Sequence, residues 1–333
     1  MPEKLIEVHN LVKHYPVYSK GIVLKKQIGI VHAVDDVSFD VYKNETLGLV
    51  GESGCGKTTT AKLILDLETP TSGQVLYGGN DVAKTFHSGT REEKLGLRRK
   101  MQLVFQNPYS SLDPRMTVYD IVSEPFRIHG HLTKEKWDNR VYELLKMVGL
   151  EEYHAERYPH EFSGGQRQRI CIARALAVEP EFVVADEPIS SLDVSIRAQI
   201  LNLLGELQQR VGLTYLYISH DLSSVRQISH RVAVMYLGKI VEFSDTDHLF
   251  DHPVHPYTQA LISAIPIPDP KKRMSRLVLS GEVPSPINPP MGCRFNPRCP
   301  FASASCRVEE PKLTDIGEGH LVACHQEYLS KHA

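Results

Sequence analysis

The sequence predicts an α/β protein with a doubly wound, largely parallel sheet, and three patterns support this prediction. Short apolar runs typical of buried strands alternate with longer runs of helical periodicity. A glycine-rich loop joins one of these runs, Leu47–Val50, to a helical run. Two later apolar runs end at Asp186-Glu187 and at His220, as expected where parallel strands present side chains to a ligand.

The composition is ordinary for a soluble globular protein and argues against several functional classes. A chain of 333 residues suggests about two domains, and 41% hydrophobic and 23% charged residues are typical values. A net charge of −2 creates no field that attracts nucleic acid or an anionic membrane. The longest apolar runs fall short of the ~18 residues of a membrane-spanning helix, and the first residues do not resemble a signal peptide. We therefore expect a cytosolic protein that does not bind nucleic acid.

The N-terminal 50 residues predict an antiparallel strand layer. Residues 4–50 alternate apolar and polar side chains in short stretches, interrupted over 17–31 by lysines and glycines that predict a long hairpin or loop. Tyr15, between two of the strands, is suited to stack on a purine base, although a surface tyrosine in a strand also needs no ligand.

The glycine-rich loop has the sequence of a phosphate-binding loop. It spans Gly51-Glu-Ser-Gly-Cys-Gly-Lys57-Thr58, between a predicted strand and a predicted helix. Its glycines allow a tight turn whose N–H groups converge on anionic oxygens at a helix N-terminus. Lys57 adds a charge for the β- and γ-phosphates, and the Thr58 hydroxyl is suited to Mg²⁺. A glycine-rich turn with an unrelated lysine is the alternative, which the strand, loop and helix in order disfavour.

The segment after the loop helix contains shorter elements. Residues 69–73 predict a turn, 74–77 a strand, and 80–97 a polar, irregular connection. A strand over 100–106 ends at Gln106, which either marks the surface or reaches a metal ion from a mobile loop. From about 115 to 160 the periodicity is helical and predicts a separate lobe.

A second glycine pair opens a long helix after this lobe. Ser163 is a good N-cap, and Gly164 and Gly165 leave room for a group to approach the helix N-terminus. A Ser-Gly-Gly sequence alone usually means a loop. Its weight comes from the residues downstream of it.

Those downstream residues end two predicted strands. At the end of 182–186, Asp186 suits the surroundings of Mg²⁺ and Glu187 suits a water aligned for attack on a phosphoryl group. An acidic strand end in solvent is the alternative. A predicted helix over 194–209 and a strand over 214–218 follow, and His220 comes after that strand. A lone histidine is more often structural, but His220 shares a sheet edge with the two carboxylates.

Taken together, these motifs resemble the nucleotide-binding subunit of an ABC transporter. The resemblance covers about 4–245, with Phe162 where the family usually has leucine. It implies a P-loop ATPase with a RecA-like core, an antiparallel β layer and a helical subdomain at about 107–165. The motifs that carry it are Gly51–Thr58, Gln106, Phe162–Gln166, Asp186-Glu187, Ser191–Asp193 and His220.

Three further segments resemble the ATPase subunits of bacterial oligopeptide, dipeptide and nickel importers. They are Tyr158–His160, His255–Leu261 and Gly281–Pro286. Such subunits carry a C-terminal extension, so we expect domains at 1–245 and 246–333. The long segment before His32–Phe39 resembles the F-type member of the paired ATPases.

The resemblance implies roles for individual residues. ATP bound to one subunit is closed over by Ser163, Gly165 and Gln166 of a second subunit packed head to tail. Glu187 and His220 are then catalytic, and Asp193 couples the two sites. Mg²⁺ is held by Thr58, Gln106 and Asp186. The nucleotide-binding residues implied are Tyr15, Gly51, Ser53, Gly54, Cys55, Gly56, Lys57, Thr58, Thr59, Gln106, Ser163, Gly164, Gly165, Gln166, Asp186 and Asp193.

It also implies partners and a location. The chain would act at the cytoplasmic face of the inner membrane, with a second, paralogous ATPase subunit or a copy of itself. Two transmembrane permease subunits and, indirectly, an extracytoplasmic peptide-binding protein complete such an importer. The expected function is import of di- or oligopeptides. The alternatives are an importer of nickel chelates or glutathione, a cassette of phosphonate breakdown, and an ABC ATPase that moves no solute.

Four of the six cysteines lie in the last 41 residues, at Cys293, Cys299, Cys306 and Cys324. A cytosolic location disfavours disulfides, so the cluster suggests a bound metal. Zinc is the general expectation for four thiolates, but the spacing is not that of a zinc ribbon, nor of a ferredoxin. In similar importer ATPases this tail is associated with a [4Fe–4S] cluster, and free thiols are the remaining alternative. Cys55 and Cys171 lie in the ATPase core and are expected to be incidental.

Overall fold

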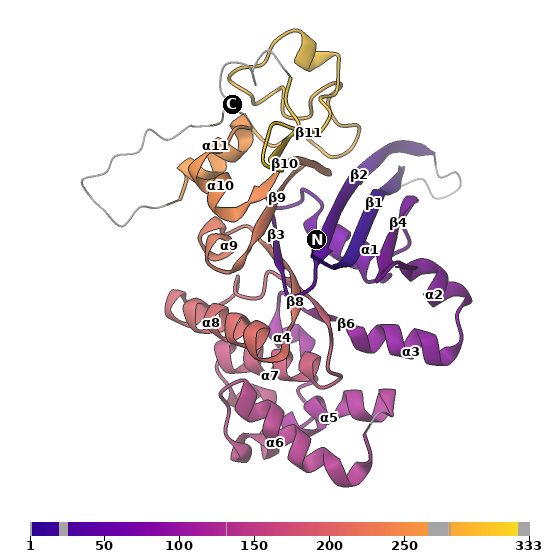
Figure 1. The fold of residues 1–333 in the computed structure, drawn as a ribbon, viewed down its shortest axis with the longest axis vertical. Coiled ribbons are helices and arrows are strands. Elements are labelled where there is room, and N and C mark those ends of the chain that lie inside the picture. The colour runs from indigo at the N-terminus through magenta and orange to yellow at the C-terminus, as the bar shows by residue number, and fades with distance from the viewer. Residues whose placement is uncertain (1, 20–25, 131, 266–278, 280, 326–333) are drawn as a thin grey trace, which may run out of the picture. The chain divides into compact units, whose positions relative to one another are not determined.

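The structure, a computed structural model, describes residues 2–19, 26–130, 132–265, 279 and 281–325. Within this part of the chain, no helix has both the length and the apolar composition needed to cross a membrane. The chain divides into two compact units, which are described in turn (Figure 1). Unit 1 comprises Met1–Ile6, Val41–Thr46 and Leu76–Ser219, and unit 2 comprises Glu7–Asp40, Leu47–Val75 and His220–Ala333.

The core of unit 1 is a parallel sheet. Its strands are β6 (Met101–Val104), β7 (Phe182–Asp186) and β8 (Thr214–Ser219), in the order β8-β7-β6. Every residue of β7 and β8 is buried, as their unbroken apolar runs predict for strands covered on both faces. The helices α7 (Gly164–Leu176) and α8 (Val194–Val211) follow the predicted ranges closely.

Helices also fill the predicted lobe. It contains α4 (Pro108–Ser111), α5 (Val118–His129) and α6 (Trp137–Met147), with short 3₁₀ turns at Lys134–Lys136, Glu152–Glu156 and Pro159–Glu161. Figure 1 shows α5 and α6 packed beside α7. Leu144, Leu145 and Phe126 are fully buried there, so the helical periodicity of this segment corresponds to apolar faces that pack inward.

The expectation of an irregular connection over 80–97 was wrong. After the short hairpin of β4 (Ser72–Tyr77) and β5 (Asn80–Asp81), the chain forms α2 (Val82–Ser88) and α3 (Arg91–Lys100). The Asp81 carboxylate accepts the Lys84 N–H and caps α2. Thr90 and Glu93 form a reciprocal capping box on α3. Caps stabilise these helices although few of their apolar residues are buried, and hydrophobic periodicity alone did not reveal them.

Unit 2 contains the larger sheet segment β11-β12-β10-β9-β3. Strand β3 runs parallel to β9, whereas β10, β12 and β11 are antiparallel to their neighbours. Its helices are α1 (Lys57–Ile64), α9 (Leu222–Ile228), α10 (Thr246–Asp251), α11 (Pro256–Ser263) and a 3₁₀ turn at Ser305–Arg307. The strands are β3 (Thr46–Val50), β9 (Arg231–Tyr236), β10 (Lys239–Asp245), β11 (Thr314–Asp315) and β12 (Leu321–Val322).

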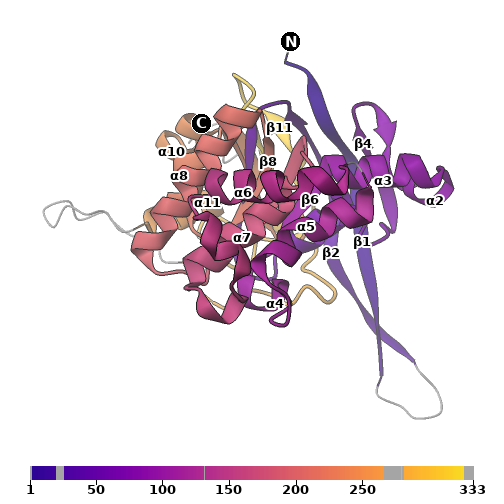
Figure 2. The ribbon, with the colours of Figure 1, turned by 90° about the horizontal axis from the view of Figure 1, so that it is seen from below.

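The antiparallel layer has longer strands than expected. Strands β1 (Lys4–Tyr18) and β2 (Gln27–Tyr42) run side by side (Figure 2), so the segment over 17–31, expected to be a long hairpin or loop, has strand at both of its described ends. The Ser19 N–H donates to the Lys26 carbonyl at 2.8 Å and continues the pairing beyond β1. Residues 20–25 lie outside the described residues.

A buried carboxylate joins the C-terminal segment of unit 2 to β10. Glu242, with 0% exposure, accepts the Val254 N–H at 2.8 Å, the His255 N–H at 3.0 Å and a hydrogen bond from His320 Nε2 at 2.8 Å. Three donors compensate the desolvation of one buried carboxylate. Glu242 therefore fixes both the start of α11 and the turn before β12.

We predict an acid-sensitive step in stability at His255. This buried imidazole accepts the Tyr257 N–H through Nδ1, and burial lowers its pKa to about 4, although Glu242 opposes the shift. Between its unfolded pKa near 6.5 and this folded value, the unfolded chain binds the extra proton. The stability contribution is thus present above pH 6.5 and lost as pH falls toward 4, by roughly 3 kcal/mol. Denaturant unfolding at several pH values measures this loss.

His255→Asn is the matched variant, because asparagine also caps a helix but does not titrate. Between pH 6.5 and 4, the variant should lose roughly 3 kcal/mol less stability than the parent chain. Parallel curves for the two proteins would contradict the prediction.

Candidate functional site

The phosphate loop leaves the carboxyl end of β3 and turns directly into α1. Lys57 is the first residue of α1 and is 5% exposed. Its Nζ donates to the carbonyl oxygens of Gly51 at 2.7 Å and Glu52 at 3.0 Å, so the ammonium is held at the centre of its own loop. A cation surrounded by loop backbone at a helix N-terminus is an anion-binding arrangement.

The loop requires glycine at its last turn. Gly56 has φ +113°, and a Cβ there would lie 2.1 Å from the Ala33 carbonyl oxygen. Ser53, Gly54 and Thr58 are exposed on the loop surface. The Cys55 thiol is buried, and burial raises its pKa, which lowers the reactivity of the thiol.

Tyr15 lies next to this loop helix. Its half-buried side chain hydrogen-bonds to Thr59, and Lys13 Nζ lies 4.9 Å from the ring centroid. Burial, followed by the nearby Glu68 charge, raises the Tyr15 pKa. The structure therefore brings Tyr15, Thr59 and the phosphate loop together in unit 2. His220 belongs to the same unit and is exposed at the residue before the N-cap of α9.

Unit 1 holds the predicted catalytic carboxylate. Glu187 directly follows β7, and its Oε2 accepts a hydrogen bond from Gln106 Nε2 at 2.8 Å. The Glu187 backbone has φ +47°, a left-handed conformation that is costly for a non-glycine residue and is found most often at functional sites. Asp186, the last residue of β7, is 7% exposed and pairs in register with Ile218. Gln106, Asp186 and Glu187 thus converge at one strand end.

The Ser-Gly-Gly-Gln segment forms the N-terminus of α7. The Ser163 hydroxyl accepts the Gln166 N–H at 3.3 Å, and the Gln166 side chain accepts the Ser163 N–H at 3.1 Å. A Cβ at Gly165 would lie 2.4 Å from a methyl of Ile196, so packing against α8 already requires this glycine. Gly164, half-buried, has more room, since a Cβ would come no nearer than 3.3 Å to Leu192. Asp193 is exposed at the N-cap of α8.

The four cysteines of the C-terminal segment interact electrostatically. The Cys293 N–H donates to the Cys306 carbonyl at 2.8 Å. Burial raises the Cys293 pKa to about 11 and that of Cys324 to about 12, and neighbouring thiols add to both shifts. A tetrahedral zinc site, with Zn–S near 2.3 Å, would place its sulfurs roughly 3.8 Å apart. Among the described residues, no three cysteine sulfurs lie within 4.8 Å of one another.

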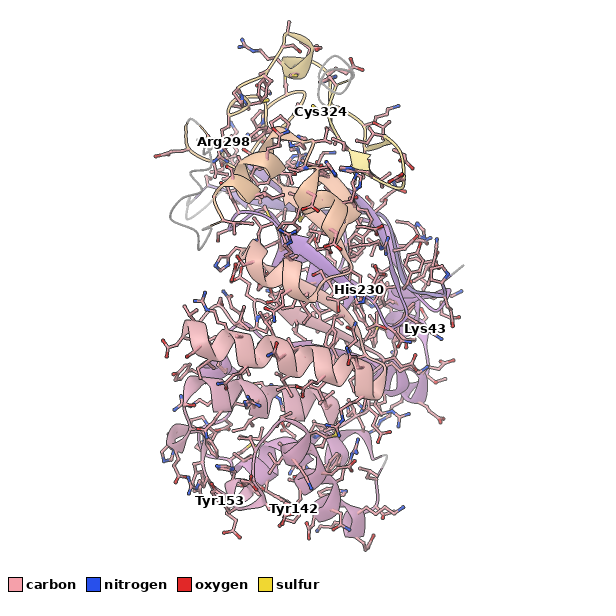
Figure 3. All side chains as sticks on the ribbon, turned by 60° about the vertical axis from the view of Figure 1, so that its left-hand side comes forward. Lys43, Tyr142, Tyr153, His230, Arg298 and Cys324 are labelled. Atoms are coloured by element: carbon pink, nitrogen blue, oxygen red, sulfur yellow. The ribbon has the colours of Figure 1, made fainter. Side chains whose placement is uncertain are left out.

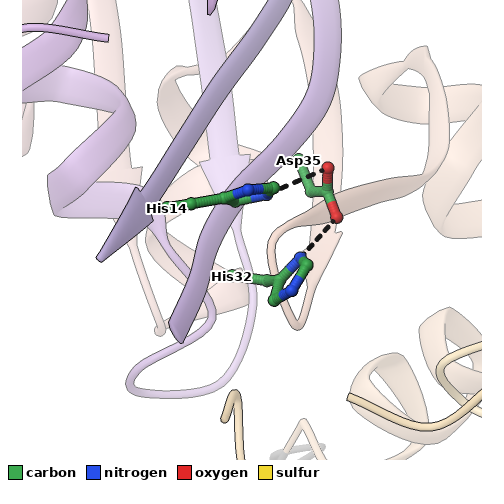
Figure 4. A group of neighbouring side chains, drawn as sticks. All are labelled: His14, His32 and Asp35. Atoms are coloured by element: carbon green, nitrogen blue, oxygen red, sulfur yellow. Dashed lines mark hydrogen bonds and ion pairs between the residues drawn. The ribbon is translucent and has the colours of Figure 1, made fainter. Parts of the chain in front are cut away.

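The structure also gathers residues that sequence reasoning missed. His14, His32 and Asp35 are the one group of three described residues whose ligand atoms lie within 4.8 Å of one another (Figure 4). His14 Nε2 lies 3.3 Å and His32 Nδ1 3.0 Å from the Asp35 carboxylate, which Arg294 also contacts. Burial opposes ionisation of Asp35, but His32 and Arg294 lower its pKa to about 2. Since the Arg294 charge competes with any cation, we interpret this group as an ion-pair cluster.

Family models match two parts of the chain. The model described as "ABC transporter" matches residues 34–190, and "Oligopeptide/dipeptide transporter, C-terminal region" matches 241–306. The second match covers three of the four C-terminal cysteines and the segment from β10 onward.

Curated relatives align over nearly the whole chain. A probable peptide ABC transporter ATP-binding protein, y4tS of Sinorhizobium fredii, is 52% identical, over 98% of this chain and 90% of its own. The oligopeptide transport ATP-binding protein AppF of Bacillus subtilis is 50% identical, over 97% of both chains. Among solved structures, the dimeric ATP-binding cassette MJ0796, in a post-hydrolysis state with ADP and Pi, is similar with TM-score 0.62. That cassette is 29% identical, and the match covers 73% of this chain and 99% of the cassette.

Proposed function

The chain belongs to the family of ATP-binding proteins of peptide ABC transporters, and from this premise we propose how its residues bind and hydrolyse ATP. It is an ATPase that powers import of peptides, as the full-length similarity to peptide transport ATP-binding proteins supports. The observation that carries the residue assignment is the Gln106–Glu187 hydrogen bond at the end of β7. This bond supports the assignment, because a carboxylate suited to act as a base lies beside a side-chain amide suited to Mg²⁺.

Lys57 and the loop N–H groups receive the β- and γ-phosphates, and Tyr15 stacks on the adenine. Thr58, Gln106 and Asp186 hold Mg²⁺. Glu187 accepts a proton from the attacking water, and His220 holds that water in line. This assignment is supported by the Lys57 position at a helix N-terminus and by the left-handed Glu187 backbone.

The residues at the N-terminus of α7 act on a second ATPase subunit. Ser163, Gly165 and Gln166 close over the ATP of that subunit, with the N-terminal dipole of α7 directed at the γ-phosphate. Asp193 couples the two sites. The partner is a paralogous ATPase, and both dock on two permease subunits at the cytoplasmic face of the inner membrane. An extracytoplasmic binding protein selects the peptide. The dimeric form of the similar solved cassette supports the pairing.

The C-terminal extension, 246–333, follows the ATPase domain, 1–245, and its four cysteines hold a [4Fe–4S] cluster. The four thiols lie near enough to one another to interact electrostatically, as the ligands of one shared group would. When bound, the cluster supplies a covalent staple for a segment with little regular structure.

One experiment tests both proposals. The chain is purified anaerobically from its native membrane, and co-purifying subunits, iron and zinc are measured on the same sample. We expect two permeases, one different ATPase and about four irons per chain. Recovery alone or with soluble partners would contradict the importer assembly. A colourless complex with stoichiometric zinc would contradict the cluster but leave the transport function standing.

A further inference from the structure

The cysteine segment carries two buried arginines, one of which binds a residue of the phosphate loop. They are Arg294, next to Cys293, and Arg298, next to Cys299, and each is 7% exposed. Figure 3 shows Arg298 and Cys324 in the C-terminal segment of unit 2, the unit that also holds the phosphate loop. Charged side chains are rarely buried without a partner, so the partners of these arginines indicate their role.

Arg298 binds a residue of the phosphate loop itself. Its Nη1 donates to Glu52 Oε2 at 2.7 Å and its Nη2 to Glu52 Oε1 at 3.1 Å, which is the two-point geometry of a strong guanidinium–carboxylate pair. The bonds to Glu52 raise the Arg298 pKa. Glu52 occupies the second position of the loop, between Gly51 and Ser53.

Every polar group of Glu52 is engaged. The carboxylate is bound by Arg298, the N–H donates to the Tyr257 hydroxyl at 2.9 Å, and the carbonyl accepts from Lys57 Nζ. Tyr257, with 0% exposure, is itself packed against Phe295, at 5.5 Å between ring centroids. Two of these contacts therefore come from the segment after residue 245, and another comes from the lysine that the loop presents to phosphate.

Arg294 contacts the phosphate loop indirectly, through backbone that hydrogen-bonds to it. It donates to the Leu237 carbonyl and to the Asp35 carboxylate. The adjacent Gly238 N–H donates to the Cys55 carbonyl at 2.8 Å, and the Asp35 N–H donates to the Gly238 carbonyl at 2.8 Å. Arg294 therefore holds in place the backbone at Leu237 and Gly238, to which the Cys55 carbonyl is hydrogen-bonded.

The negative charge on Glu52 explains why its bond to Arg298 matters for ATP binding. A carboxylate within a loop that must receive a triphosphate repels the ligand, and the repulsion is strong where solvent is excluded. Arg298 neutralises this charge and holds the carboxylate in a fixed two-point bond. Without Arg298, Glu52 would be an unpaired anion beside Lys57 and would compete with phosphate for that ammonium.

We propose that Arg298 is a positioning residue for ATP binding: the C-terminal cysteine segment holds the phosphate loop, through the Arg298–Glu52 pair, in the conformation that receives ATP. The inference rests on the proposed binding of phosphate at Lys57. It does not require a metal at the cysteines, but it makes their segment a part of the nucleotide site.

The test measures ATP affinity of the full chain by titration calorimetry with Mg²⁺. Arg298→Ala is expected to weaken ATP binding by about 10-fold to 100-fold, as a displaced positioning group does. In the assembled transporter, the KM for ATP should rise with little change in kcat. Arg307→Ala, an exposed arginine also next to a cysteine, is the matched control and should bind ATP as the parent chain does.

Glu52→Gln in the Arg298→Ala background distinguishes charge neutralisation from general packing. Because the double variant lacks the unpaired anion, it should recover most of the lost affinity. No recovery, or unchanged binding in Arg298→Ala, would overturn the inference. If Arg298→Ala does not fold, Arg298→Gln carries the test: it keeps a hydrogen-bonding side chain but removes the charge that neutralises Glu52, and unchanged ATP affinity there would equally overturn it.

Lys57→Ala distinguishes failure of the proposed phosphate binding at Lys57 from failure of the role proposed for Arg298. If it leaves ATP affinity unchanged, the phosphate assignment itself fails. If it abolishes binding while Arg298→Ala has no effect, only the role of Arg298 fails.

Discussion

Glu187→Gln is expected to slow ATP hydrolysis by about 10²-fold to 10⁴-fold while ATP binding stays intact. Glutamine has the size of glutamate and still offers a carbonyl oxygen to the Gln106 amide, which lies 2.8 Å from Glu187 Oε2. It cannot take a proton from water at neutral pH. The loss should therefore appear in kcat, measured as phosphate release in the assembled transporter, with ATP affinity of the isolated chain as the companion measurement.

Glu206→Gln is the control for this variant. Glu206 is exposed on α8, so the same chemical change there should leave hydrolysis unaltered. If Glu187→Gln hydrolysed ATP at the parent rate, another group would have to be the base. Loss of binding together with hydrolysis would indicate a structural role for Glu187 instead.

The second large effect is expected at Lys57. Lys57→Ala should weaken ATP binding by about 30-fold or more, which corresponds to at least 2 kcal/mol, because it removes the ammonium that the loop backbone holds at its centre. Titration of the full chain with ATP and Mg²⁺ measures the affinity, and thermal unfolding checks that the variant is folded.

Lys62→Ala provides the comparison. Lys62 lies in the last turn of the same helix, α1, and is exposed, so its removal lowers the net charge equally but leaves the loop intact. Equal ATP affinities in the two variants would argue against phosphate binding at Lys57.

The sequence correctly predicted the elements that are determined by side chains close to one another in the chain. The buried runs of β7 and β8, the loop between β3 and α1, and the Ser163 cap of α7 each follow from side chains within a few residues. It missed α2 and α3 because caps and charged side chains define them, and their few buried residues leave no strong apolar stripe.

It also missed the contacts between distant residues that belong to none of the recognised motifs. Arg298 and Glu52 are 246 positions apart, and nothing in their local sequences distinguishes them from solvated surface charges. The grouping of His14 and His32 around Asp35 likewise depends on how β1 and β2 pair. Such pairs can be identified only when the fold brings the two segments together.

The left-handed backbone of Glu187 lowers the stability of the fold at a residue that the proposed ATP hydrolysis requires. A glutamate held at φ +47° costs about 1–3 kcal/mol of folding free energy, which glycine at this position would not incur. Because the side chain is the proposed base, the chain retains a residue that its backbone disfavours. Selection for thermal stability alone would therefore drive this position toward the amino acid that ends catalysis, and stabilised designs of this ATPase should hold Glu187 fixed.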